Sequence, residues 1–290
     1  MRPGFDDKVL ADWNGLMIVA LANAAQAFDR KEWLEAAERA FAFVSTRMTS
    51  NGRLLHAWRA GEAKAPATAS DYANMIRAAL ALANATGDHD YVALAHAWVD
   101  VLDRHYWADD LGGYYFAADD TGDLIVRPFS GQDEATPNAN GVMVSNLMAL
   151  YSWTGEARYR DRAEAILRGF AGAMSENVLA HAGLLAATID VAAPALIVLI
   201  VPEGGDAREL RGALRDVSLP NVVVQEVGAG DASVESGASA LPDSSPAHGK
   251  TAIDNKPTAY VCIGPQCSLP VTEPAALVET VKISRPVTLT

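Results

Sequence analysis

Hydrophobic and polar residues follow a pattern that repeats three times along the first two thirds of the chain. Three stretches align with one another at offsets of 58 and 68 residues: 17–44, 75–102 and 143–170. Each stretch is interrupted at its centre by a short turn, the first of them at 28–30. Each stretch therefore predicts a helical hairpin, and three hairpins at a nearly constant spacing predict a helical array.

The two helices of each predicted hairpin differ in their hydrophobic pattern. The stretch 15–28 carries only Asn23 and Gln26 as polar residues, and a helix that is apolar on all sides is usually buried on all sides. The stretch 31–48 is amphipathic, with charged residues on one side and large apolar residues on the other. An inner ring of helices wrapped by an outer ring satisfies both patterns and predicts an α/α toroid. A flat solenoid is the alternative, but it would leave the first helices more exposed.

The pattern changes after about residue 192. A continuous β-branched run at 194–202, a helical stretch at 206–217 and a second β-branched run at 221–227 predict a β-α-β unit with a parallel strand pair. We therefore predict a mainly α fold with two domains and one flexible loop: a partial, three-hairpin α/α toroid of the six-hairpin glycosidase type at 1–192, a small α/β domain at 193–290, and the loop at 228–249.

The connections between the predicted hairpins are long and carry strand-like pieces. They occupy 52–70 and 109–137, and both lead into the start of a predicted inner helix. Long loops gathered at one end of a regular scaffold usually carry binding and catalytic residues. We therefore expect the functional site at the inner-helix N-termini.

The start of each inner helix is polar in all three copies of the repeat. The aligned positions form three sets: Asp12 with Ser70 and Asn138, Trp13 with Asp71 and Ala139, and Asn14 with Tyr72 and Asn140. Asp, Ser and Asn have a plain structural role there as N-caps, which accept hydrogen bonds from free backbone N–H groups. The polar and aromatic groups together also suit a polyol site, where hydroxyls need paired donors and acceptors and a sugar ring needs a flat face.

Composition narrows the possible partners of the chain. Half of the 290 residues are hydrophobic, and the formal net charge is −13. An acidic chain without a basic stripe does not suit nucleic acid. The longest strongly apolar run, 193–202, is too short to span a bilayer, and no signal peptide is recognisable at the start, so we predict a cytoplasmic protein with no membrane partner.

The chain has two cysteines, Cys262 and Cys267. Two cysteines do not make a disulfide framework, and this number suits a reducing compartment. The spacing C-x4-C is a poor fit to the CxxC redox pattern, and a zinc site would lack two ligands. The favoured interpretation is a strand cysteine and a turn cysteine that lie near each other.

Five segments of the chain carry a resemblance to a known family: "DDKVLADWNGLM" (6–17), "SDYA" (70–73), "GGYYF" (112–116), "TPNANG" (136–141) and "AYVCIGPQCSLPVTEPAAL" (259–277). They resemble the C-terminal part of the thioredoxin-domain-containing, spermatogenesis-associated protein family. The resemblance implies a plan with an N-terminal thioredoxin-like module, a six-hairpin toroid similar to those of N-acylglucosamine and cellobiose epimerases, and a small terminal domain.

This chain departs from that family plan in three respects. It opens at about the fourth hairpin, so we expect Met1 to be a truncated or mis-assigned start. Ser70 stands where the family commonly has a carboxylate, and 137–140 reads Pro-Asn-Ala-Asn where the family commonly has Ser-Gly-Asn. Three hairpins cannot close a ring, so we expect exposed apolar faces at the open edges. These faces would lead to self-association or to pairing with the missing N-terminal half.

Three residues are the candidates for catalysis. Asp71 begins an inner helix and suits an acid or base with a shifted pKa, although a helix cap or an ion pair with Arg59 or Lys64 explains it equally well. His56 suits a proton shuttle for epimerisation, although it could be an ordinary surface histidine. Glu134 with Asp71 would supply the carboxylate pair that glycoside hydrolysis needs.

The remaining predictions concern ligands and function. The histidines on helical segments show no metal-binding spacing, so we predict no metal and no cofactor. We predict a carbohydrate-active or carbohydrate-binding protein with an epimerase-, isomerase- or glycosidase-like site and a sugar-like ligand. The alternative is a non-catalytic scaffold or ligand-binding module that accompanies a thioredoxin-like domain. The candidate substrate-binding residues are Asp12, Trp13, Asn14, Trp58, Arg59, Tyr72, Asn138 and Asn140.

Overall fold

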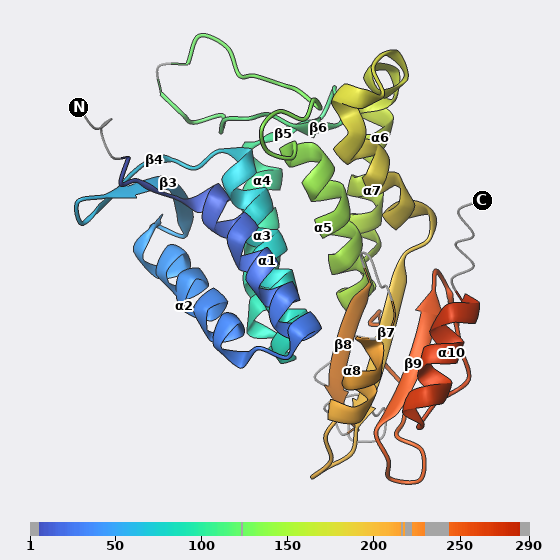
Figure 1. Cartoon of the computed structure of the whole chain (residues 1–290). Coiled ribbons are helices and arrows are strands. Elements are labelled where there is room, and N and C mark those ends of the chain that lie inside the picture. The colour runs from blue at the N-terminus through green and yellow to red at the C-terminus, as the bar shows by residue number, and fades with distance from the viewer. Residues whose placement is uncertain (1–5, 123, 216, 218–221, 230–243, 285–290) are drawn as a thin grey trace. The chain divides into compact units, whose positions relative to one another are not determined.

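The computed structural model of the protein describes residues 6–122, 124–215, 217, 222–229 and 244–284 (Figure 1). The chain divides into two compact units. The first comprises 1–146 and 164–187, and the second comprises 147–163 and 188–290. The predicted division at residue 192 stays a prediction; the central strand of the terminal sheet begins at Ala195, close to that point.

Three helical hairpins follow one another along the chain, as the repeat predicts: α1 (Ala11–Phe28) with α2 (Lys31–Arg47), α3 (Ala69–Thr86) with α4 (Asp90–His105), and α5 (Ala139–Thr154) with α6 (Ala157–Glu176). The residue that ends the first helix of each hairpin occupies the same repeat position. Asp29, Gly87 and Gly155 all have positive φ, at 54°, 78° and 71°. A left-handed residue at this position ends the first helix and reverses the chain.

The inner and outer helices differ in burial in the way that the sequence predicts. In α3, 13 of 18 residues are buried, and they include the polar residues Asp71 and Asn74. In α2 only Ala37, Phe41 and Val44 are buried, because one side of the helix faces solvent. In Figure 1, α1 and α3 run side by side in the first unit. Their backbones approach so closely at Gly15 that an added Cβ would lie 2.7 Å from the carbonyl carbon of Asn74.

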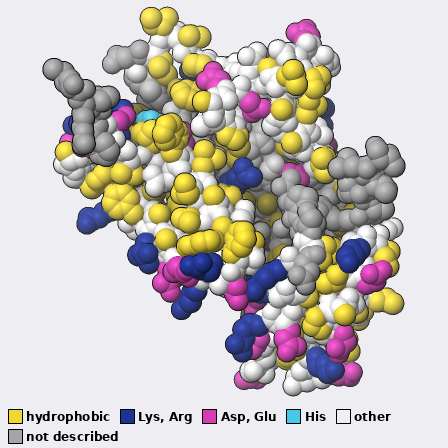
Figure 2. Space-filling view, viewed as in Figure 1, with side chains coloured by type: hydrophobic (Ala, Val, Ile, Leu, Met, Phe, Trp, Pro, Cys, Tyr) yellow, Lys and Arg dark blue, Asp and Glu magenta, His cyan; other side chains and the backbone are white. Residues whose placement is uncertain are grey.

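The inner helix α1 keeps one apolar face exposed. Met17 is 59% exposed, whereas Met75 and Met143, at the same position of the repeat, are fully buried. Trp13 and Ala20, one turn to either side of Met17, are exposed as well. These three residues, which we call the α1 edge, lie on one face of the helix. Figure 2 shows hydrophobic side chains exposed over the region of α1 and α2.

We expect the α1 edge to make the chain self-associate at micromolar concentration, because it presents a surface that the other two repeats bury. Met17→Lys should weaken this association by about tenfold to a hundredfold, which corresponds to roughly 1.5–3 kcal/mol of lost apolar burial. Sedimentation velocity over a concentration series measures the effect. Leu269→Lys, at an exposed apolar residue of the second unit, is the matched control. A wild-type chain that stays monomeric up to high concentration would contradict the prediction.

The long connections form small antiparallel sheets beside the inner-helix starts. In the first connection β3 (Arg53–Arg59) pairs with β1 (Val9–Leu10), β2 (Thr49–Ser50) and β4 (Glu62–Pro66). Val9 lies opposite Trp58 and Leu10 opposite Ala57, so β3 is fixed next to the start of α1. In the second connection β5 (Trp107–Ala108) pairs with β6 (Gly113–Tyr114). These pairings hold the loops against the helix ends.

After the third hairpin the chain continues with a 3-10 turn, η1 (Leu179–His181), and the helix α7 (Ala182–Ala192). Among the described residues, no helix combines the length and the apolar character that crossing a membrane requires.

The terminal part of the second unit is an α/β sheet with the strand order β10-β9-β7-β8. Its elements are β7 (Ala195–Val201), α8 (Arg208–Leu214), β8 (Val223–Gly228), β9 (Thr258–Ile263), β10 (Gln266–Cys267) and α10 (Pro274–Ser284). The strands β7 and β8 are parallel, as predicted, and β9 runs antiparallel to β7. Side chains of β7 and β9 form one hydrophobic core with α8 and α10. Of the predicted loop 228–249, residues 230–243 lie outside the described part of the chain.

The prediction for the two cysteines was incomplete. Cys262 and Cys267 do lie near each other, but they are joined by a disulfide. Cys267 lies in strand β10 rather than in a turn, directly opposite Cys262 on β9. The antiparallel hairpin brings the two side chains together, and sequence spacing alone does not show this. The sequence interpretation placed the two cysteines near each other and did not assign a bond between them.

Candidate functional site

The start of α3 is held by a capping box. Thr68 is the N-cap, and its hydroxyl accepts a hydrogen bond from the backbone N–H of Asp71, while the Asp71 side chain accepts one from the backbone N–H of Thr68. This arrangement satisfies two of the backbone donors that a helix start leaves free. The cap is thus Thr68 and not Ser70, which the repeat alignment suggests. Thr68 lies two residues outside the aligned set.

Asp71 also caps a second helix. Its Oδ1 accepts a hydrogen bond of 3.0 Å from the backbone N–H of Asp12, in the first turn of α1. The N-cap of α1 is Leu10, which offers no side-chain acceptor, so Asp71 supplies one from the neighbouring helix. The Asp71 side chain is fully buried and joins the starts of two inner helices. The predicted ion pair with Arg59 or Lys64 is absent among the described contacts, where Arg59 pairs with Asp7 and Lys64 with Glu62.

The third partner of Asp71 is His56 on β3. The Nδ1 atom of His56 lies 2.9 Å from Oδ2 and 3.1 Å from Oδ1 of Asp71. The carboxylate is an acceptor, so the proton is on Nδ1 and the lone pair of the neutral ring is on Nε2. The hydrogen bond to Asp71 raises the pKa of His56, against the effect of partial burial. The His56 side chain is one-third exposed, so the ring is positioned by a buried group and still reaches solvent.

Asp12 lies beside this pair, and together the three residues form a small cluster. Burial, followed by repulsion from Asp71, raises the pKa of Asp12. The side-chain atoms of Asp12, His56 and Asp71 lie close enough to surround a metal ion, and so do those of His105, Asp119 and Asp120. In the first group, however, Asp71 is already saturated by hydrogen bonds. In the second group, Asp120 pairs with Arg53. These groupings give no observation that favours a metal over the contacts already made.

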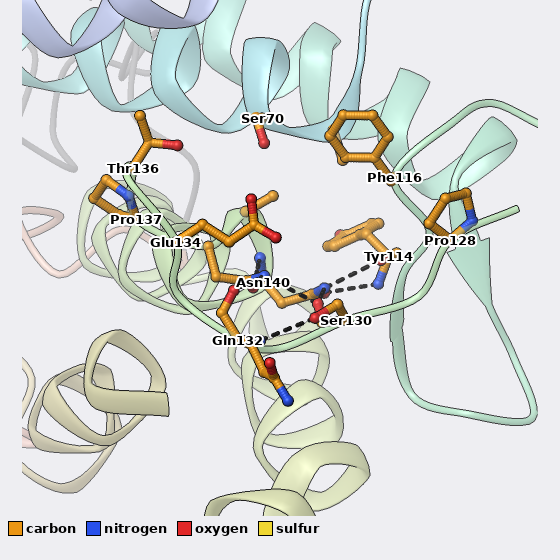
Figure 3. A pocket seen from close by; sticks show the side chains of 13 residues that line it. Ser70, Tyr114, Phe116, Pro128, Ser130, Gln132, Glu134, Thr136, Pro137 and Asn140 are labelled. Carbon is orange, nitrogen blue, oxygen red and sulfur yellow. Dashed lines mark hydrogen bonds between the residues drawn. The ribbon is translucent and has the colours of Figure 1, made fainter. Parts of the chain in front are cut away.

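A pocket of about 330 Å³ opens between the starts of α3 and α5 (Figure 3). Its walls come from both helix starts and from the second long connection: Ala69, Ser70, Tyr114, Phe116, Pro128, Ser130, Gln132, Glu134, Thr136, Pro137, Asn138, Ala139 and Asn140. In Figure 3 the Glu134 carboxylate points into the space below Ser70, and the Phe116 ring borders the same space. Glu134 is the one carboxylate among the lining residues that the structure describes, and none of them is a lysine or arginine.

Two asparagines build the floor of this pocket. The Oδ1 of Asn140 accepts a hydrogen bond from the backbone N–H of Tyr114, and its Nδ2 donates to the carbonyls of Tyr114 and Ser130. Asn138 caps α5, as predicted, because its Oδ1 accepts from the backbone N–H of Asn140. The amide groups of both residues are thus engaged with backbone, which fixes the loop and leaves little of them for a ligand.

Asp133 also stabilises the loop that forms the pocket. Its carboxylate accepts hydrogen bonds of 2.9 Å from the N–H of Asn138 and 2.6 Å from the N–H of Gly183. Sequence reasoning missed this role, because Gly183 lies fifty residues away. An added Cβ at Gly183 would lie 2.7 Å from Asp133 Oδ1, so any larger residue there would displace this carboxylate. The acidic residue that remains available for a ligand is therefore its neighbour, Glu134.

Several residues predicted to contact a ligand do not line this pocket. Tyr72 is fully buried, and its hydroxyl accepts a hydrogen bond from the N–H of Leu54, so it belongs to the core. Asn14 donates to the carbonyl of Leu10 within its own helix start. Trp58 packs edge-to-face on Phe43, and Arg59 lies exposed at the end of β3. Trp13 is 62% exposed and belongs to the α1 edge.

The single functional site predicted at the three inner-helix N-termini is thus replaced by two neighbouring features of the first unit. The first two inner-helix starts, with β3, form the Asp12–His56–Asp71 cluster. The second and third starts form the pocket that contains Glu134. Asp71 does not line that pocket, so the structure does not pair it with Glu134.

Comparison with known proteins places these features in a family. A model described as N-acylglucosamine 2-epimerase (GlcNAc 2-epimerase) matches residues 13–181, which is more than half of the chain. The chain belongs to the N-acylglucosamine 2-epimerase family. The matched region contains nearly all of the three hairpins, His56 and Asp71 of the cluster, and the whole lining of the pocket.

Relatives of this family member include much longer proteins. Spermatogenesis-associated protein 20 of Mus musculus is 27% identical over 286 residues, which cover 94% of this chain and 35% of the mouse protein. Protein B0495.5 of Caenorhabditis elegans is 27% identical over 279 residues, which cover 93% of this chain and 37% of the worm protein. These matches confirm the resemblance to the spermatogenesis-associated family. The chain spans about a third of the length of these relatives.

A solved structure shares the fold. The GH76 α-mannanase BT2949 of Bacteroides thetaiotaomicron superposes with a TM-score of 0.52 at 16% identity, covering 73% of this chain and 58% of the mannanase. At this identity the likeness shows the fold alone. The fold class is the predicted one, a mainly helical partial α/α toroid.

Proposed function

We propose that this chain carries a carbohydrate site of the epimerase or isomerase type, in which His56 transfers a proton. The observation that carries the proposal is the pair formed by His56 and the buried Asp71 at the start of an inner helix. Changing the configuration at carbon 2 of a sugar requires that a proton next to a carbonyl be removed and returned. A histidine whose second nitrogen is held by a carboxylate is suited to this step.

In this proposal Asp71 positions His56 and does not touch the sugar. Its carboxyl group is fully buried and occupied by backbone donors, so it has no atom free for a substrate. Its hydrogen bond fixes the tautomer of His56 with the lone pair on Nε2. The catalytic role predicted for Asp71 is thereby replaced by a positioning role.

We assign part of the sugar binding to the pocket that contains Glu134. His56 does not line this pocket, so the sugar carbon that reacts would lie outside it, beside the His56 ring. The pocket volume of about 330 Å³ is of the size that small-molecule pockets have. Phe116, nearly half exposed, offers a flat apolar face, while Glu134 offers an acceptor for hydroxyl groups. Glycoside hydrolysis by Asp71 and Glu134 is less well supported, because a buried carboxyl group that is held by a capping box cannot protonate a leaving group.

The second candidate function is a ligand-binding module without turnover. It is favoured by the observation that Asn138 and Asn140 use their amide groups on backbone rather than presenting them to the pocket. In this case the chain would bind a sugar-like ligand and serve a longer protein as a scaffold. A thioredoxin-like partner module and a cytoplasmic location remain part of this proposal.

A solvent-exchange experiment separates the two functions. The chain is incubated in D2O with N-acetylglucosamine, N-acetylmannosamine, mannose and cellobiose, and proton NMR follows the signal at carbon 2. We expect loss of the carbon 2 proton and appearance of the epimer for at least one sugar. Binding without exchange would favour the scaffold, and neither binding nor exchange with any of these sugars would overturn the carbohydrate proposal.

A further inference from the structure

The disulfide between Cys262 and Cys267 lies outside the proposed carbohydrate site, in the second unit. Its two sulfur-bearing residues differ in exposure. Cys262 is 3% exposed on β9, whereas Cys267 is exposed on the short edge strand β10. The two residues are register partners whose Cα atoms lie 3.9 Å apart. An attacking group from solvent therefore has access to one of the two sulfurs.

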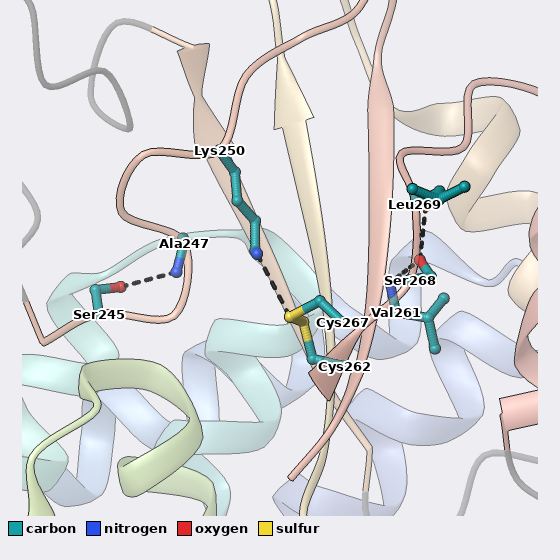
Figure 4. Close-up of a disulfide and its surroundings, with 8 residues drawn as sticks. All are labelled: Ser245, Ala247, Lys250, Val261, Cys262, Cys267, Ser268 and Leu269. Carbon is teal, nitrogen blue, oxygen red and sulfur yellow. Dashed lines mark hydrogen bonds between the residues drawn. A yellow bond between two sulfur atoms is a disulfide. The ribbon is translucent and has the colours of Figure 1, made fainter. Parts of the chain in front are cut away.

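A lysine lies next to the accessible sulfur. The Lys250 ammonium nitrogen lies 3.4 Å from the Sγ of Cys267, and Figure 4 shows the side chain pointing at that sulfur. The same ammonium lies over the Tyr260 ring, 4.9 Å from its centroid. The Tyr260 hydroxyl donates a hydrogen bond to the carbonyl of Thr251, which holds the ring in place. Among the contacts of the described residues, no carboxylate pairs with Lys250. Its positive charge is therefore directed to Cys267.

A cationic group beside a cysteine favours the thiolate, which is the reactive form of the side chain. A cysteine that is exposed and has a lysine neighbour suits attack on outside disulfides. A buried cysteine opposite it suits the resolving role, because it can reach only its partner. The burial of Lys250 lowers the pKa of its ammonium, which is the direction expected for a partly desolvated lysine.

We propose that Cys262 and Cys267 form a thiol–disulfide exchange site, in which Cys267 is the sulfur that reacts with outside thiols and disulfides. A dithiol reductant supplies the electrons. Its thiolate attacks Cys267 Sγ, the bond between the two protein sulfurs breaks, and Cys262 leaves as a thiolate and takes a proton from water.

The second thiol of the reductant then loses its proton and attacks the reductant sulfur of the mixed disulfide. Cys267 leaves as a thiolate beside Lys250, and the reductant leaves as a disulfide. The protein gains two electrons and the dithiol loses two. An outside disulfide oxidises the pair through the same steps in reverse.

Labelling of the full chain tests the assignment of the two sulfurs. The protein is reduced with dithiothreitol at pH 7 without denaturant, freed of reductant, and treated with less than one equivalent of iodoacetamide. Peptide mass mapping should find Cys267 modified at least tenfold more than Cys262. Equal modification, or a disulfide that resists dithiothreitol until the protein unfolds, would overturn the proposal.

Substitutions test the role of Lys250 and the order of attack. A change of about one unit in thiol pKa alters the thiolate fraction about tenfold, and the accompanying change in nucleophilicity leaves roughly a threefold effect on rate. Lys250→Met should therefore slow the modification of Cys267 about threefold. Lys256→Met removes an exposed lysine that pairs with Glu273 and should leave the rate unchanged. An unchanged rate in Lys250→Met would remove Lys250 from the site.

The two single cysteine variants should behave differently with oxidised glutathione. Cys262→Ser should accumulate a stable glutathione adduct on Cys267, whereas Cys267→Ser should form the adduct at least tenfold more slowly. Far-UV circular dichroism shows whether each variant is folded. If either fails to fold, labelling of the reduced wild-type chain still decides the assignment. A fast adduct on Cys262 would contradict the proposed order.

Discussion

Replacement of His56 by Gln is expected to lower the rate of proton exchange at sugar carbon 2 by about 10²- to 10⁴-fold, the usual contribution of a positioned acid or base. Glutamine has a similar size and can still accept a hydrogen bond or donate one to Asp71, but it cannot take up a proton near neutral pH. The expected effect is therefore on turnover rather than on folding. The measurement is the NMR exchange assay on the best sugar, with kcat and KM determined separately.

The chain offers a matched control for this substitution. His96 is also paired with an aspartate, Asp100, at 3.5 Å, but it lies on the outer helix α4 and is not part of the Asp12–His56–Asp71 cluster. His96→Gln should leave the exchange rate within a factor of two. Equal rates in wild type and His56→Gln would remove His56 from the mechanism, even if the sugar still binds.

Replacement of Asp71 by Ala is expected to lower the free energy of unfolding by about 3 kcal/mol, which is a large part of the 5–15 kcal/mol typical of a folded chain. Alanine leaves the backbone N–H groups of Thr68 and Asp12 without their acceptor and removes the partner of His56. Buried donors without an acceptor are costly, and the capping box contributes roughly another 1 kcal/mol. Urea unfolding followed by circular dichroism measures the change.

The loss of unfolding free energy caused by Asp71→Ala should depend on pH, because it includes the loss of the His56–Asp71 pair. Asp71 raises the pKa of His56 in the folded chain, so the pair contributes its full stability below the unfolded pKa of about 6.5 and loses the charged part as the pH rises through the folded pKa. The destabilisation caused by Asp71→Ala should therefore be larger at pH 6 than at pH 9. A destabilisation that is the same at both pH values would mean that the His56 pair contributes no charge-dependent stability.

Asp100→Ala is the control for the stability prediction. Asp100 is also an aspartate next to a histidine, but its side chain is 47% exposed, and exposed ion pairs contribute little. It should change the free energy of unfolding by less than about 0.5 kcal/mol. A loss in Asp71→Ala as small as that in Asp100→Ala would contradict the view that Asp71 joins the starts of α1 and α3.

Much of the fold was predictable because its signals are local. The repeat spacing and the all-round apolar character of 15–28 predicted hairpins with an inner and an outer helix. The turn residues Asp29, Gly87 and Gly155 fall at one repeat position because each hairpin needs a left-handed residue there. The terminal β-α-β order and its parallel strands followed from β-branched runs and from the handedness of crossover connections.

The candidate site was predictable only in part. The sequence singled out His56, Asp71 and Glu134 as ionisable residues in loops or at helix starts, but it treated Asp71 and Glu134 as a pair. In the structure the Asp71 carboxylate is hydrogen-bonded to His56, because β3 passes the start of α3 and places its histidine there. Glu134 faces a separate pocket. The Asp133–Gly183 contact had no signal in the sequence, since a backbone N–H fifty residues away has no side-chain pattern.

The amino-acid sequence by itself determined where the helices of the three hairpins and the parallel strands β7 and β8 lie and which helix faces are apolar, because periodicity and turn chemistry act over a few residues. Only the tertiary structure decided that Thr68 is the N-cap of α3, that Asp71 holds His56, that Tyr72 belongs to the core, and that Cys262 meets Cys267. Each of these depends on how the elements pack and how the strands pair. A hydrogen bond or a disulfide forms only where packing brings two particular atoms within about 3 Å or less, and that proximity is a property of the folded chain.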